Sequence, residues 1–224
     1  MTSDEAKLEA ARAALVELPE AGVVGLGSGS TSKLFIDEVG LLVRAGRRLE
    51  GVPTSLGSRT QAEALGIPLL GDDGPWDIAV TVDGADEVDE RLNLIKGGGG
   101  AHLREKMVNG ASRRNVIIVD ASKLSARLGE KWPVPVEVVP FGHLQTKKRL
   151  AELGKPKLRE RAGAVWMTDA GNVIYDVAMG LLDRPAEADR ALRSIPGVVE
   201  TGLFVGRANV VLVAEASGVR RLEA

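Results

Sequence analysis

Between Gly22 and Asp120, short apolar runs rich in β-branched residues alternate with segments of helical periodicity. This alternation is typical of repeated βαβ units around a parallel sheet. The apolar runs are continuous rather than alternating, which indicates strands buried on both faces. The expected strands are 23–27, 49–54, 67–70, 77–84 and 115–120. The fold class predicted for this part is a Rossmann-like α/β domain.

After Val134 the pattern changes to strand (134–139), helix (143–153, closed by Gly154), two strands joined by the hairpin turn 169–172, helix (186–195) and strand (198–204). This βαββαβ order predicts a smaller, ferredoxin-like α+β domain. A last strand, 209–216, is expected to rejoin the first sheet. The predicted domains are 1–129 (Rossmann-like), 130–205 (small α+β, inserted near the C-terminus) and 206–224 (return segment).

Composition excludes several classes of function. The 29 basic and 31 acidic residues are interspersed, so the chain lacks the basic surface that nucleic-acid binding requires. No apolar run approaches the ~18 residues of a membrane helix, and the N-terminus lacks the layout of a signal peptide. There is no cysteine and there are only two histidines, so the chain has few residues from which a metal centre or a Ser-His-Asp triad could be built. We expect a cytoplasmic protein without membrane or nucleic-acid partners, whose acid-base chemistry falls to carboxylates and lysines.

The segment GLGSGSTSK (25–33) joins the first strand to a helix. A glycine-rich turn at a helix N-terminus exposes backbone N–H groups to an anion. The dinucleotide-binding fingerprint fails, because Ser30 or Ser32 stands where its third glycine belongs, and the P-loop pattern fails as well. The segment therefore favours phosphate binding without a nucleotide; the alternative is an ordinary tight turn with a Ser or Thr cap.

In TVDGADEVDE (81–90), Asp83 ends a buried strand at the carboxyl edge where ligands of open α/β sheets bind, and Asp86 follows three residues later. Two carboxylates so placed can transfer protons. The alternative is a turn that is rich in Asp and Gly for conformational reasons. Calcium fits poorly, because the spacing does not supply EF-hand ligands, and magnesium stays open.

LIKGGGGAHLREKMV (94–108) contains four consecutive glycines, whose entropic cost suggests that the backbone there approaches a ligand or adopts conformations closed to other residues. Lys96 leads into this tract. The helix after it should bury one stripe and leave Glu105 on roughly the opposite side. That stripe consists of Leu103, Met107 and Ala111. The plain alternative is a solvated glutamate. Lys123, after a further buried strand, could reach an anion or simply meet water.

Together the motifs resemble the metal-independent ribose-5-phosphate isomerase A family. They are GLGSGSTS, VDGADE, IKGGGG followed by LREK, DASK, PVEVVPFG and IPGVVETGLF, in that order. The resemblance runs from about residue 4 to the end. Family members often have threonine at the position of Ser28, a change that keeps the hydroxyl. The resemblance implies the same two-domain fold and an isomerase that interconverts D-ribose 5-phosphate and D-ribulose 5-phosphate in the non-oxidative pentose phosphate pathway, without a cofactor or metal.

By the same resemblance, Glu105 is the catalytic base, and Asp83, Asp86 and Lys96 are the other catalytic positions. The implied substrate-binding residues are Ser28, Gly29, Ser30, Thr31, Asp83, Gly84, Ala85, Asp86, Lys96, Gly97, Gly98, Gly99 and Lys123, and Lys7 is a further residue expected to help hold the phosphate. The hypothesis is that Glu105 moves a proton between C2 and C1 through a cis-enediol(ate), while Lys96 and backbone N–H groups of the glycine tract stabilise the charged oxygens. Asp83 or Asp86 would open the furanose ring and exchange the hydroxyl protons.

Two other functions compete with this interpretation. One is a non-catalytic sugar-phosphate sensor on the same fold, which would be expected to lack Glu105 or Lys96 and to carry a DNA-binding helix-turn-helix. The other is a nicotinamide-dependent dehydrogenase, which the failed fingerprint disfavours. The resemblance further implies a homodimer or a dimer of dimers.

Overall fold

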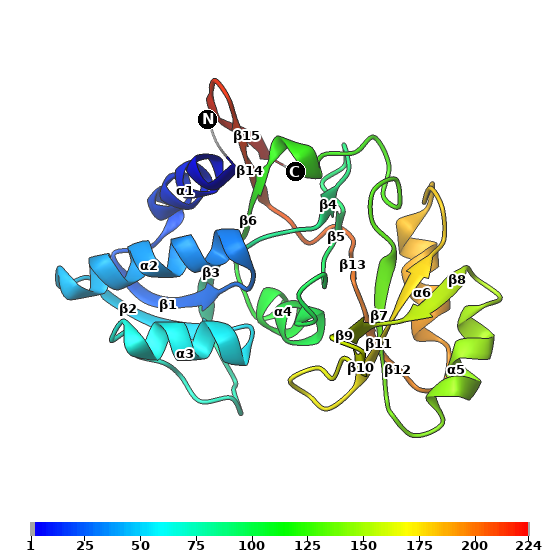
Figure 1. The fold of residues 1–224 in the computed structure, drawn as a ribbon. Coiled ribbons are helices and arrows are strands. Elements are labelled where there is room, and N and C mark those ends of the chain that lie inside the picture. Colours follow the sequence, from blue (N-terminus) through cyan, green and yellow to red (C-terminus); the bar gives the residue numbers. More distant parts are fainter. Residues whose placement is uncertain (1–2, 224) are drawn as a thin grey trace. The chain divides into compact units, whose positions relative to one another are not determined.

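The computed structural model describes residues 3–223 as a mixed α/β protein (Figure 1). By its internal contacts the chain divides into two compact units. The first holds the described residues up to Ala85, then Arg104–Ser122, and then those from Arg207 onward. The second holds Asp86–Leu103 and Lys123–Gly206. The predicted domain boundaries at 129/130 and 205/206 stay a prediction.

The first unit contains a six-stranded sheet with the order β15-β14-β6-β3-β1-β2. All neighbours in it pair in parallel except β14 and β15. Its strands are β1 (Ala21–Leu26), β2 (Arg48–Pro53), β3 (Ile78–Asp83), β6 (Asn115–Asp120), β14 (Val210–Glu215) and β15 (Gly218–Glu223). Its helices are α1 (Ser3–Ala13), α2 (Ser30–Arg44), α3 (Leu56–Ala64) and most of α4 (His102–Gly110), with a 3₁₀ turn at Ala14–Glu17. The mainly parallel α/β class is confirmed.

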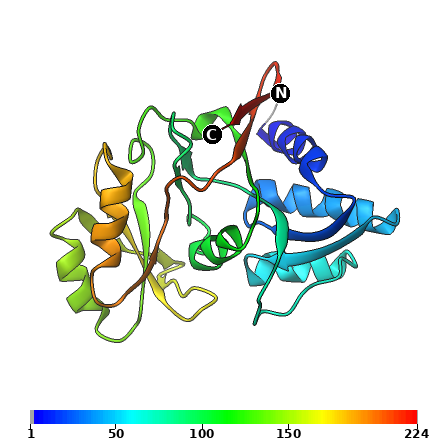
Figure 2. The same cartoon turned by 180° about the vertical axis from the view of Figure 1, so that it is seen from behind.

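The core of the first unit forms between the helices and the central strands. On α2, Phe35, Ile36 and Val39 are fully buried at helical spacing, because they form the apolar stripe of that helix. Helix α1 packs against α2, β6 and β14, and its buried residues are small alanines such as Ala10, which allow close approach. Strand β14 runs beside β6, as Figure 2 shows. The return of the chain end to the first sheet is therefore confirmed.

Two details of this sheet differ from expectation. Residues 67–70 form no strand; Leu69 makes only an isolated parallel bridge to Gly51. The run is too short to continue the ladder beyond that bridge. Conversely, the polar segment Gly218–Glu223, which follows the predicted last strand, forms edge strand β15. The hydrophobic pattern does not reveal this strand, because an exposed edge strand need not be apolar.

The second unit is built mainly on an antiparallel sheet with the order β12-β7-β11-β8. Its elements are β7 (Val134–Val138), α5 (His143–Leu150), β8 (Lys155–Leu158), β11 (Val173–Ala178), α6 (Pro185–Arg193) and β12 (Val198–Thr201). Their order along the chain is the predicted βαββαβ. β11 pairs antiparallel with β7 and β8, however, and not with the segment 165–168, which contributes only the bridge between Met167 and Val173.

Smaller pairings complete the second unit. A three-stranded sheet has the order β13-β5-β4, and a two-stranded one joins β10 to β9. These strands are β4 (Glu87–Val88), β5 (Leu94–Ile95), β9 (Glu160–Arg161), β10 (Ala164–Val165) and β13 (Leu203–Phe204). A 3₁₀ turn at Ala121–Lys123 spans the boundary between the two units along the chain. The expected strand 198–204 is thus divided between β12 and β13, which belong to different sheets.

Candidate active site

The turn between β1 and α2 presents exposed backbone at a helix N-terminus. Gly29 is the N-cap of α2, with φ of 96°, and no side chain caps the helix. Gly29 and Ser30 are exposed, and Thr31 is half-buried. The first N–H groups of a helix have no partner within it, and the helix dipole adds partial positive charge at the same place. This end of α2 can therefore bind an anion.

Asp83, at the end of β3, holds this turn in place through hydrogen bonds. Its Oδ1 accepts hydrogen bonds from the backbone N–H of Ser28 at 2.9 Å, the backbone N–H of Gly84 at 2.8 Å and the hydroxyl of Ser32 at 3.2 Å. A Cβ on Gly27 would lie 2.3 Å from the same oxygen, so only glycine allows this approach. The carboxylate is 2% exposed. The structure thus joins the motif 25–33 to the first residues of the motif 81–90 within the first unit.

The Ser28 side chain connects the turn to a neighbouring segment that sequence reasoning did not include. Its hydroxyl lies 2.7 Å from the hydroxyl oxygens of both Thr54 and Ser55, which follow β2. Ser55 is itself the N-cap of α3 and forms a capping box with Ser58. The two adjacent hydroxyl residues that end the segment VPTS (52–55) were the sequence feature that could have indicated this contact. Ser28 is therefore anchored through its side chain as well as its backbone.

Asp86 and the glycine tract lie together in the second unit. Asp86 Oδ2 accepts a 2.7 Å hydrogen bond from the Gly98 backbone N–H. Gly97 and Gly100 have φ of 106° and 81°, so half of the tract adopts backbone conformations that other residues avoid, as expected. Gly98 and Gly99 are exposed. Their backbone can therefore be reached by a ligand.

Lys96 is buried, with 4% of its surface exposed. Its backbone N–H donates to the Gly202 carbonyl at 2.9 Å, and its Nζ lies 5.5 Å from the centre of the Phe204 ring. Burying an ammonium group is costly unless other groups stabilise it. A lysine kept in such a place is more consistent with a specific role than with a solvated surface residue.

Glu105 lies on α4 and is 5% exposed, which rules out the solvated-glutamate alternative. The predicted buried stripe on this helix is wrong, because Met107 is 56% exposed while His102, Lys106 and Asn109 are buried. Apolar periodicity misplaced the face because the buried side of α4 carries mostly polar residues beside the apolar Val108. A carboxylate held out of bulk water on a helix is the kind of group that general acid-base catalysis uses.

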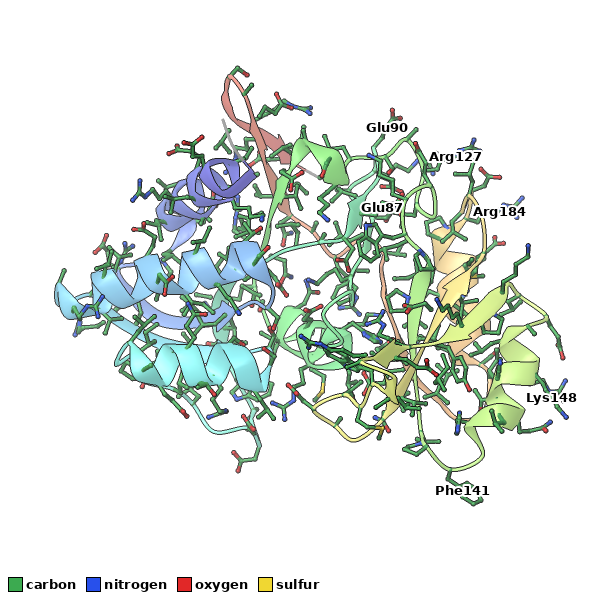
Figure 3. The ribbon with its side chains drawn as sticks, viewed as in Figure 1. Glu87, Glu90, Arg127, Phe141, Lys148 and Arg184 are labelled. Atoms are coloured by element: carbon green, nitrogen blue, oxygen red, sulfur yellow. The ribbon has the colours of Figure 1, made fainter. Side chains whose placement is uncertain are left out.

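Lys123 is positioned through a loop that Glu87 anchors. The buried carboxylate of Glu87 (Figure 3) accepts hydrogen bonds from four successive backbone N–H groups, at 3.0 to 3.2 Å. These belong to Gly129, Glu130, Lys131 and Trp132. The Trp132 ring then lies under the Lys123 ammonium, 5.4 Å from ring centre to Nζ. Glu87 follows Asp86 directly and lies inside the motif 81–90, but no role for it was expected from the sequence. Its hydrogen-bond partners are more than 40 residues away, so no local pattern indicates them.

Other predicted positions are placed as follows. Gly84 and Ala85 are half-buried and end the first segment of the first unit, and Lys7 lies on α1 with a half-buried side chain. Outside the predicted set, Glu137 is 1% exposed, and burial raises the pKa of its carboxyl group. Its Oε1 accepts hydrogen bonds from Thr168 and Asn172, and its Oε2 lies 3.8 Å from His102 Nε2.

Within residues 3–223, no set of three or more His, Asp or Glu side chains is arranged to hold a metal ion. No helix of the described part has the length and apolar character needed to cross a membrane.

The fold defines a mixed α/β protein in which a glycine-rich turn opens a helix after the first strand of the parallel sheet. Its sequence matches the family model described as "Ribose 5-phosphate isomerase A (phosphoriboisomerase A)" over residues 50–218. Ribose-5-phosphate isomerase A of Gloeobacter violaceus is 49% identical over 227 residues, covering 99% of this chain and 97% of that protein. The relative of the same name from a Synechococcus species is 46% identical, covering 96% and 94%.

Solved structures agree. Ribose 5-phosphate isomerase A from Methanocaldococcus jannaschii superposes with a TM-score of 0.94 at 38% identity, with complete coverage of both chains. A D-ribose-5-phosphate isomerase in complex with phospho-erythronic acid superposes with a TM-score of 0.96, also at 38% identity and complete coverage. The chain belongs to the ribose 5-phosphate isomerase A family and is an enzyme of that family.

Proposed function

We propose that this chain interconverts D-ribose 5-phosphate and D-ribulose 5-phosphate, as a step of the non-oxidative pentose phosphate pathway. Family membership supports the reaction. The observation that carries the mechanism is the burial of Glu105, because a carboxylate withdrawn from water on a rigid helix can accept and return a proton without exchanging it freely with solvent.

In the proposed mechanism Glu105 removes the proton from C2 of the open-chain sugar and delivers it to C1. A second proton passes from the C2 hydroxyl group to the C1 oxygen, and we assign that transfer to the aspartate that exchanges protons with the sugar hydroxyls. The intermediate is a cis-enediol(ate), so negative charge develops on the sugar oxygens. Lys96 and the backbone N–H groups of Gly97, Gly98 and Gly99 stabilise that charge. Donors fixed before the reaction cost no reorganisation when charge appears, and this makes them effective.

The phosphate is held by the turn Ser28–Thr31 and by Lys123. Support comes from the uncapped start of α2 and from the Trp132 ring that holds the Lys123 ammonium. Binding energy gained at the phosphate, away from the reacting carbons, can be used to orient C1 and C2. Gly84, Ala85 and Lys7 stay in the proposed binding set.

Ring opening falls to Asp83 or Asp86. Asp83 is deeply buried and its Oδ1 is engaged with the β1–α2 turn, whereas Asp86 is half-buried and bonded to Gly98. A group that exchanges protons with sugar hydroxyls has to be reachable. We therefore favour Asp86 for this step and a structural contribution from Asp83.

The test is to incubate the purified chain with ribose 5-phosphate and a chelator, without any added cofactor, and to measure ketose formation. Conversion supports the proposal, and binding without conversion would indicate a sensor instead. A second measurement uses phospho-erythronic acid, a compound with a phosphate and a carboxylate group that a structural neighbour binds. We expect it to inhibit competitively, because its phosphate resembles that of the substrate and its carboxylate resembles the charged oxygens of the enediolate.

A further inference from the structure

The peptide unit between Gly97 and Gly98 is held at both ends by charged side chains. Arg159 Nη1 donates to the Gly97 carbonyl oxygen at 2.6 Å, and the Gly98 N–H donates to Asp86 Oδ2 at 2.7 Å. In a trans peptide the C=O and N–H bonds point in opposite directions. A cation therefore lies at the negative end of this peptide dipole and an anion at its positive end.

Arg159 is itself held firmly. Its Nε donates to Asp176 Oδ2 at 2.9 Å and its Nη2 donates to Asp176 Oδ1, so the pair is bidentate. The Arg159 and Asp176 side chains are only 13% and 23% exposed. The Arg159 backbone is fixed as well, since its N–H donates to the Ile174 carbonyl at 2.8 Å. Planar, two-point pairs of this kind fix orientation as well as charge.

The same guanidinium group also reaches the next peptide. Nη1 of Arg159 lies 3.3 Å from the Gly98 carbonyl oxygen. Because that carbonyl points toward Arg159, the N–H at the other end of the peptide, on Gly99, points away from it. Gly99 is exposed, and a Cβ built on it would meet no atom within 4 Å, so there is room for a ligand atom at this residue.

We propose that Arg159, held by Asp176, is a positioning residue that fixes the two peptide planes from Gly97 to Gly99 and thereby aims the Gly99 N–H at the oxygen where negative charge develops. The inference rests on the proposed function. A glycine tract has more backbone freedom than any other sequence, so its N–H groups are useful as preorganised donors only when something outside the tract holds them. Arg159 acts through the backbone.

The experiment compares Arg159→Ala and Arg159→Lys with Arg127→Ala. Arg127 is a matched control, because it forms an Arg–Asp pair with Asp183 at 2.7 Å in the same unit but at the surface (Figure 3). For Arg159→Ala we expect kcat to fall about 10- to 100-fold with KM within about threefold of wild type, since the lost interaction acts only in the transition state. Millimolar methylguanidinium should restore part of the lost kcat. Arg127→Ala should behave as wild type.

Arg159→Lys keeps the inference testable if the alanine variant does not fold. Lysine retains the positive charge but lacks the planar guanidinium group that pairs with Asp176 at two points. We therefore expect kcat to stay low and KM to stay near wild type. An unchanged kcat in either variant, or a raised KM with normal kcat, would overturn the inference. A wild-type chain that does not convert ribose 5-phosphate would instead overturn the proposed function, and this inference with it.

Discussion

The backbone N–H of Ser28 donates a 2.9 Å hydrogen bond to Oδ1 of Asp83, which lies 55 residues further along the chain. The bond ties the turn before α2 to the end of β3, which is the neighbour of β1 in the parallel sheet. Gly27 passes so close to this carboxylate that a Cβ would lie 2.3 Å from Oδ1 and 2.6 Å from the Asp83 Cα. The backbone of the proposed phosphate-binding turn is therefore held in part by this close approach.

Gly27→Ala should destabilise the protein by at least about 3 kcal/mol, because the added methyl group overlaps both a side chain and the backbone of β3. Gly29→Ala is the matched variant: its φ of 96° is strained for alanine, but no atom lies within 4 Å of the new Cβ. Because Gly29 combines φ of 96° with ψ of 178°, a region that glycine almost alone occupies, the strain should cost about 1 to 2 kcal/mol. Urea unfolding of both variants measures the difference, and equal losses would contradict the role given to the Asp83 contact.

Glu105→Gln should lower kcat for ribose 5-phosphate by about 10² to 10⁴ while substrate binding persists, because the amide cannot carry the proton. Steady-state kinetics and equilibrium binding of ribose 5-phosphate separate the two effects. Glu90→Gln serves as control, since Glu90 is an exposed glutamate (Figure 3) outside the proposed site. Near-normal turnover in Glu105→Gln would remove Glu105 from the mechanism.

Lys123→Ala should raise KM with little change in kcat, because the lost contact holds the phosphate and not the reacting carbons. Trp132→Leu removes the ring beneath the ammonium and should raise KM about 2- to 5-fold, the equivalent of a cation–π contact of about 0.5 to 1 kcal/mol. The exposed Lys148 (Figure 3) provides the control variant Lys148→Ala. If kcat falls while KM holds, Lys123 acts in the chemical step instead.

Glu137→Gln should change the pH dependence of stability. Burial raises the pKa of Glu137 in the folded protein above its unfolded value, with His102, Asp169 and Glu200 as its charged or titratable neighbours. The folded state then binds the proton more tightly, so this contribution to stability is fully present below the unfolded pKa and is lost as pH rises through the raised one. The glutamine keeps an acceptor for Thr168 and Asn172 but does not titrate.

The measurement is urea unfolding of wild type and Glu137→Gln at a series of pH values from acid to neutral. Subtracting the two free energies of unfolding isolates Glu137. We expect wild type to lose stability relative to the variant as pH rises across the window above the ordinary carboxyl pKa. A difference that is constant with pH, or that grows in favour of wild type, would show that the buried carboxyl group is not the source.

The sequence predicted the strands of the parallel sheet correctly but not the buried face of α4. The sequence predicted strands β1, β2, β3, β6 and β14, because a continuous run of apolar, β-branched residues indicates a strand that is buried on both faces. The face of α4 was predicted wrongly, since periodicity assumes that the buried side is apolar, and here it carries Glu105 and Lys106. A rule drawn from ordinary cores fails where a helix buries polar side chains.

The amino-acid sequence by itself determined where most of the strands and helices form, and which short segments carry glycines, carboxylates and lysines in the pattern of this family. Only the tertiary structure decided what holds those segments in place. The Gly97 carbonyl meets an arginine 62 residues away, and Glu87 anchors a loop that begins 42 residues further on. The local sequence pattern indicates which residues are buried and which backbone conformations they adopt. It does not indicate which distant segment a side chain will contact, because that depends on how the segments pack in three dimensions.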